Sequence, residues 1–167
     1  MRGDRKTPGS LTLMQNTKLT FLLEEFPRLL LTLKADAPGK WGVMNAQQMV
    51  EHFIEAVLVA AGKIAVPQLT PEEKLPSMKA FLFSDKPFQE NTKNPLLKET
   101  PPAPRLADME AAVSELQRAF EAFIDSYKAD PSKEIINPFF GPLDFAGQQQ
   151  LLHKHALHHL RQFGIEA

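Results

Sequence analysis

A long proline-rich stretch divides this chain and limits the folds open to it. Eight prolines fall between Ile64 and Ala107, and only Pro71 to Phe83 shows a helical pattern within that stretch. Connections of this length are unusual in a compact domain and usually form a functional cover or a crossover. A helix precedes the stretch and another follows it. We therefore expect a helical bundle with one long crossover rather than simple up-and-down hairpins.

Four stretches carry the apolar periodicity of helices, which predicts an all-α fold class. They run from about Thr17 to Lys34, from Asn45 to Gly62, from Asp108 to Lys128 and from Asp144 to Phe163. Asn45, Asp108 and Asp144 are suitable N-caps, and Gly62 and Gly164 are suitable C-terminal stops. Pro27 interrupts the first stretch, so the sequence predicts either a kink there or a main helix that starts there.

The third stretch is assigned to the core because its stripe offers no metal ligand. The stripe consists of Met109, Ala112, Val113, Leu116, Ala119, Phe120, Phe123 and Tyr127. The following segment, Ala129 to Leu143, is expected to consist of turns. The second stretch is apolar almost all round, so we expect it to be largely buried.

The composition favours one globular domain, residues 16–167, preceded by a flexible tail, residues 1–15. Hydrophobic residues make up 43% and charged residues 23% of the chain, which is ordinary for such a domain. Met14 is a second possible start of the protein. A net charge of −1 argues against a nucleic-acid or anionic-membrane surface as the main partner.

The chain contains no cysteine, which excludes disulfides, thiolate ligands and a cysteine nucleophile. This fits a reducing compartment. The segment Leu11 to Met14 is too short for a signal-peptide core, and no apolar run approaches the roughly 20 residues of a membrane span. We therefore expect a cytoplasmic protein.

All five histidines fall in two short segments. His52 lies in the second predicted helix, and four histidines lie near the C-terminus. Because a helix turns about 100° per residue, His155 and His159 share the core-facing sector of the fourth helix. His158 lies to one flank of that sector, and His153 points nearly the opposite way.

Three imidazoles that converge from two helices would make an open metal site. Neutral imidazole is the commonest metal ligand, and three such ligands leave coordination positions for water or substrate. A set of hydrogen-bonded core histidines is the alternative, although unpaired imidazoles on an apolar stripe would be costly to bury. Both interpretations remain open on spacing alone. Glu55, one turn after His52, is a candidate acceptor or base beside the site.

Three segments of the chain resemble the DinB-like superfamily of four-helix metalloproteins. The first is Trp41 to His52, the second is Met78 to Phe81 together with Asn94-Pro95, and the third is Pro138 to Leu143 followed by His155 to Gly164. The similarity is greatest to a branch known only as a domain of unknown function, the DUF1569 type. The resemblance as a whole covers nearly the whole chain, from about Phe26 to Gly164.

The resemblance implies a DinB/YfiT-type four-helix bundle with a long crossover between its second and third helices. It also implies a divalent metal (Zn, Ni, Mn or Fe) bound by His52, His155 and His159. Relatives often have histidine before the proline that corresponds to Pro138, whereas this chain has Asn137. Homodimers are common in the superfamily, so the face that carries His153, Leu157 and Leu160 would pack either under the connection or against a second subunit.

The leading hypothesis is a metal-dependent enzyme that activates water or a small thiol, for hydrolysis or S-transfer on a small molecule. Known superfamily members include thiol-dependent S-transferases, an isomerase and suspected hydrolases. Glu55, His158 and Arg161 are candidates for catalytic or substrate contacts. The alternative is a non-catalytic helical bundle that a metal stabilises, or a metal-responsive binding module. A di-iron carboxylate bundle is excluded because the fourth helix has no inward carboxylate.

Overall fold

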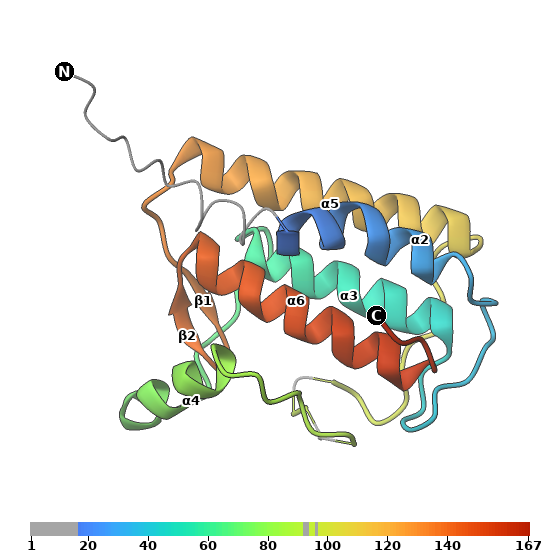
Figure 1. Cartoon of the computed structure of the whole chain (residues 1–167), viewed down its shortest axis with the longest axis horizontal. Coiled ribbons are helices and arrows are strands. Elements are labelled where there is room, and N and C mark those ends of the chain that lie inside the picture. The colour runs from blue at the N-terminus through green and yellow to red at the C-terminus, as the bar shows by residue number, and fades with distance from the viewer. Residues whose placement is uncertain (1–16, 92–93, 96) are drawn as a thin grey trace.

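The computed structural model describes residues 17–91, 94–95 and 97–167, so the predicted flexible tail, residues 1–15, lies outside the described residues. The described chain is mostly helical. Its longer helices lie side by side, while a short helix and a small sheet lie together at one end (Figure 1). None of the helices in the described part is long and apolar enough to cross a membrane.

The first helix passes through Pro27 by changing its pitch. A π-helical turn, η1 (Phe21–Glu25), leads directly into α2 (Phe26–Leu30). The N–H of Phe26 bonds to the carbonyl of Phe21, which is the wider π spacing. Proline has no N–H and clashes with the carbonyl of the preceding turn, so a wider turn beside it relieves both problems. The helix therefore continues through Pro27 with a local change of pitch and does not start there.

The second helix, α3 (Ala46–Ala60), begins as predicted. The Asn45 side chain accepts a hydrogen bond from the N–H of Gln48 at 2.9 Å, and the Gln48 side chain accepts one from the N–H of Asn45 at 2.9 Å. This reciprocal capping box satisfies two backbone donors that would otherwise lack partners. Gly62 after α3 and Gly164 near the C-terminus both adopt positive φ angles, of 74° and 79°. Glycine suits such helix ends because it has no Cβ to clash there.

The central core forms where α5 (Met109–Ala129) packs against α3. Asp108 caps α5 by accepting a hydrogen bond from the N–H of Ala111 at 2.8 Å. All eight residues of the predicted stripe are buried. They join a core cluster that also contains buried residues of α2, of α3 and of the last helix.

A short antiparallel hairpin, β1 (Ile135–Asn137) and β2 (Gly141–Leu143), lies in the segment that we expected to consist only of turns. The expectation of an all-α fold was therefore incomplete. Strands of three residues are too short to show an alternating pattern. The Asn137 side chain accepts hydrogen bonds from the N–H groups of Phe139 at 2.9 Å and Phe140 at 3.1 Å. Asn137 thus stabilises the hairpin turn.

The proline-rich connection contains the local helix that the sequence predicts. It consists of a 3-10 turn, η2 (Glu72–Lys74), and α4 (Leu75–Leu82). Leu82 is fully buried in a second, smaller hydrophobic cluster. The other buried members of this cluster are Phe140, Leu143 and Leu151. The connection therefore packs over the hairpin and the last helix.

Candidate metal centre

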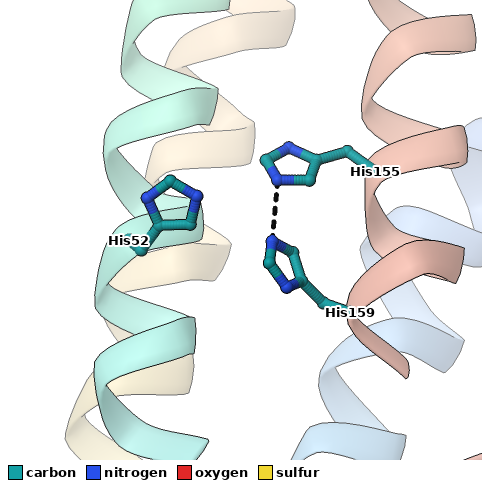
Figure 2. A group of neighbouring side chains, drawn as sticks. All are labelled: His52, His155 and His159. Carbon is teal, nitrogen blue, oxygen red and sulfur yellow. Dashed lines mark hydrogen bonds between the residues drawn. The ribbon is translucent and has the colours of Figure 1, made fainter. Parts of the chain in front are cut away.

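His52 is positioned by the middle of α3. Met49 and Phe53, its neighbours on the inward side of this helix, are both 0% exposed. Their burial fixes how α3 is rotated about its axis. With that rotation, the His52 imidazole extends toward the last helix and stays partly exposed (Figure 2).

The last helix, α6 (Phe145–Gln162), carries the other two histidines of the predicted trio. The Asp144 side chain caps its first turn. Leu152, on the same side, is buried in the central core and directs this side of the helix inward. His155 and His159 lie one turn apart and face His52 across the space between the helices (Figure 2).

The three imidazoles converge closely. One ligand atom from each lies within 4.8 Å of the other two. Nε2 of His155 and Nε2 of His159 are 2.8 Å apart, and the ring centroid of His52 is 5.6 Å from that of His155 and 5.5 Å from that of His159. The structure therefore brings together the three residues that sequence spacing and the family resemblance both selected.

The surroundings keep the trio neutral near pH 7. Burial lowers the pKa of His52 to about 4. Burial, followed by repulsion from His52, lowers the pKa of His159 to about 3. Burial also lowers the pKa of His155 well below its usual value, and repulsion from the neighbouring histidines adds to this effect. Neutral imidazole is the form that binds a metal, so no proton has to leave the trio first.

Gln162 fixes the tautomer of His159, a role that our sequence analysis missed. Its Nε2 donates a hydrogen bond to the backbone carbonyl of Trp41 at 3.0 Å, which turns its Oε1 toward Nδ1 of His159 at 2.7 Å. An amide oxygen only accepts, so Nδ1 of His159 carries the proton and Nε2 presents a lone pair. Nε2 of His155 then donates a hydrogen bond to this lone pair. The spacing of three residues from His159 was the available signal for Gln162.

This donor set fits a divalent cation. Bonds of about 2.0–2.1 Å to imidazole, as in zinc sites, place neighbouring ligand nitrogens roughly 3–3.4 Å apart. The His155 and His159 nitrogens are slightly closer than this, and His52 lies within 4.8 Å of both. Metal binding at these Nε2 atoms needs small side-chain rotations and the tautomer of His155 that carries its proton on Nδ1. Three imidazoles suit zinc, nickel or iron better than magnesium or calcium, which prefer oxygen ligands.

We expect Gln162→Leu to weaken metal binding about 10- to 100-fold, the usual cost of removing a partner that orients a ligand histidine. Without the amide oxygen, His159 is free to rotate and to adopt the wrong tautomer. The dissociation constant for Zn²⁺ or Ni²⁺ is measured by titration calorimetry. Gln117→Leu is the control, because Gln117 is exposed on α5, a helix that carries none of the three histidines. Equal affinity in the two variants would remove Gln162 from the site.

Metal-free protein is expected to lose stability as the pH falls from 7.5 to 5.5. The folded pKa values of His52 and His159 lie below the unfolded value near 6.5. The unfolded chain therefore binds more protons, and acid favours it over this whole interval. The unfolding equilibrium constant should rise about tenfold for each such histidine. Urea unfolding in the presence of a chelator measures the change, and a flat or opposite profile would contradict the burial of neutral imidazoles.

The remaining candidate residues lie at different distances from the trio. The His158 ring centroid is 5.3 Å from that of His159, and burial, followed by repulsion from Arg161, lowers the pKa of His158. Arg161 is half-buried, so its charge reaches this side of the site. Glu55 is exposed on α3, and its charge acts on Arg105. His158 and Arg161 thus flank the trio, whereas Glu55 is directed toward solvent.

His153 is separate from the trio, as its helical position predicts. Its ring packs edge-on against Phe21 of η1, with the centroids 5.3 Å apart. Leu160, on the same face, is 1% exposed and belongs to the central core. His153 and Leu160 therefore pack against the first helix and the central core, and not under the connection.

Aromatic rings surround the histidines and were not assigned to the site from sequence. The Phe53 centroid lies 4.7 Å from that of His155, and the Phe88 centroid lies 6.2 Å from it. Trp41 packs against His158 with the centroids 5.6 Å apart. Phe88 belongs to the proline-rich connection, so sequence spacing could not relate it to α6.

Comparison with known proteins identifies one family. The family model described as the DinB superfamily matches residues 16–163, which is nearly the whole chain. No curated protein and no solved structure matches this chain.

Proposed function

The chain belongs to the DinB superfamily, and on this premise we propose that it is a metal-dependent enzyme acting on a small molecule. His52, His155 and His159 would hold the divalent ion. The observation that carries the proposal is their convergence: three neutral imidazoles from two helices place their ligand atoms within 4.8 Å of one another. Three protein ligands, unlike four, leave a position for water or substrate.

The ion would supply the chemistry of a Lewis acid, lowering the pKa of water or of a small thiol at its open position. The protein residues position the reactants. Nδ1 of His158 is buried and has no hydrogen-bond partner within the described part of the chain. We assign it to accept a hydrogen bond from the substrate. Arg161, beside His158, is assigned to bind an anionic group of the substrate. The reaction is assigned to hydrolysis or S-transfer.

Several finer assignments belong to the same proposal. We infer that the helices form the DinB/YfiT type of four-helix bundle, and that residues 16–167 make up one domain. We also place the chain in the DUF1569-type branch, on the segments around His52 and His155. Zinc, nickel, manganese and iron are the candidate ions, and a homodimer is the candidate assembly.

The proposal is tested by measuring turnover with and without metal. Tag-free protein is assayed with small thiols and with ester and amide substrates, before and after chelation. Activity should disappear on chelation and return with Zn²⁺, Ni²⁺, Mn²⁺ or Fe²⁺. Activity that is indifferent to His155→Ala would exclude the trio as the reaction centre. The metal found after overexpression is not decisive, because affinity follows a general order that availability can override.

A non-catalytic role for the same site predicts a different result. A metal that only joins α3 to α6 should contribute strongly to folding. Chelation would then lower the melting temperature steeply, while no thiol or substrate would change the metal's spectrum in cobalt-substituted protein. That pair of results would favour a metal-stabilised bundle or a metal-responsive binding module over an enzyme.

A further inference from the structure

The ammonium group of Lys154 is enclosed by backbone carbonyl groups. The residue lies on α6 and is only 6% exposed. Its Nζ donates hydrogen bonds to the carbonyl oxygens of Phe81 at 3.2 Å and Ser84 at 2.9 Å, and also to that of Lys86. An ammonium group has three N–H donors, so these three acceptors satisfy it fully.

The three carbonyls lie at the end of α4 and in the chain that follows it. The last carbonyls of a helix have no partner within the helix, and a cation beside them is favourable. Lys154 also lies over the ring of Phe81, with Nζ 4.7 Å from the centroid. One turn earlier on α6, Gln150 donates to the carbonyl of Leu82 at 2.9 Å. Two successive turns of α6 therefore hold the same stretch of the connection.

This stretch leads to the candidate metal centre. Phe88 follows the last of the three acceptors, and its ring centroid lies 6.2 Å from that of His155 and 5.9 Å from that of His158. Phe81, which accepts from Lys154, also packs against Phe88 with the centroids 5.8 Å apart. Lys154 and His155 are adjacent in sequence, so one turn of α6 carries both the anchor and a ligand.

We propose that Lys154 is a positioning residue that holds residues 81–88 against α6, so that Phe88 forms a wall of the histidine site. The anchoring does not depend on a metal, whereas the importance of the wall rests on the proposed function. With the wall in place, Phe88 keeps water from one side of His155 and limits the size of a ligand that reaches an ion there.

The anchoring is tested by amide hydrogen exchange on metal-free protein. Lys154→Met keeps most of the length of the side chain but removes the donor to the carbonyls of Ser84 and Lys86, while the carbonyl of Phe81 keeps its hydrogen bonds from Ser84. Exchange in the peptide that covers residues 81–90 should accelerate about tenfold or more, while exchange in α3 and α5 stays unchanged. Lys86→Met is the matched control, because the Lys86 side chain is exposed and only its backbone carbonyl meets Lys154. Unchanged exchange in the Lys154→Met peptide overturns the proposal.

A second measurement tests the wall. Protein loaded with Ni²⁺ is mixed with excess chelator, and Lys154→Met and Phe88→Ala should both release the ion about tenfold faster than wild type and Lys86→Met. Equal release rates in all four proteins would show that Phe88 does not shield the site. If wild type takes up no Ni²⁺, the proposed function fails while the exchange result still decides the anchoring. Should Lys154→Met not fold, Lys154→Gln takes its place: the same peptide should still exchange faster than in wild type, and unchanged exchange overturns the proposal.

Discussion

Replacing His155 by alanine should abolish metal binding, whereas the same replacement at His153 should leave it intact. His155 is close to both other histidines, with its Nε2 2.8 Å from that of His159 and its ring 5.6 Å from that of His52. Its loss leaves two imidazoles, which bind a divalent ion far less tightly than three. We expect the affinity for the metal to fall by more than about 100-fold, since removing only a residue that hydrogen-bonds to a ligand can lower it about 100-fold.

The measurement is elemental analysis of purified, tag-free protein, because an affinity tag would bring its own histidines. About one ion per chain is expected for wild type and for His153→Ala, and close to none for His155→Ala. His153→Ala is a demanding control: it removes the same side chain from the same helix, two residues away, on the face that packs against Phe21. Equal metal content in the two variants would falsify the site.

If wild-type protein is folded but refuses both Zn²⁺ and Ni²⁺, the trio has another role. The 2.8 Å hydrogen bond between His155 and His159, together with the bond from His159 to Gln162, would then be the whole explanation for these buried imidazoles. The protein would remain a helical member of its superfamily with histidines in the core.

The histidine trio could be predicted because helix geometry places each member on the inward face of its own helix. His155 and His159 are one turn apart on a stripe that also contains Leu152, so a sequence pattern places both on the inward face. His52 follows from the same argument on α3. The capping residues Asn45, Asp108 and Asp144 set the helix starts, and all three cap as predicted. Helix geometry and capping rules thus give the positions of the three histidines on their helices.

The residues around the trio could not be predicted because tertiary contacts place them. Phe88 and Trp41 come from segments without regular structure, and no periodicity relates such segments to α6. Lys154 is a similar case. On a helical wheel it is simply a charged residue, and its burial is explained only by the carbonyl at the end of α4 to which it donates. The hairpin could not be predicted either, because its three-residue strands are too short to carry an alternating pattern.

Replacing Phe53 by alanine should both destabilise the fold and weaken the metal site. Phe53 is 0% exposed, and its ring packs 4.9 Å from that of Phe26 and 4.7 Å from that of His155. Truncating a buried phenylalanine typically costs about 3–5 kcal/mol of the free energy of unfolding. The cavity would also remove the surface against which His155 rests, so we expect metal affinity to fall about tenfold in addition.

Phe123→Ala separates the two effects. Phe123 is also 0% exposed, but its ring contacts are with Tyr127 at 5.5 Å and Phe145 at 5.2 Å, and neither of these is a site residue. Both variants should unfold at lower urea concentration by similar amounts, and only Phe53→Ala should bind Ni²⁺ more weakly at a temperature where both are folded. If the two bind Ni²⁺ equally well, the core supports the helices without orienting the ligands. A selective loss in Phe53→Ala would mean that the residue after His52 serves the site from the inside, since one ring then supports both the core between α2 and α3 and the ligand on α6.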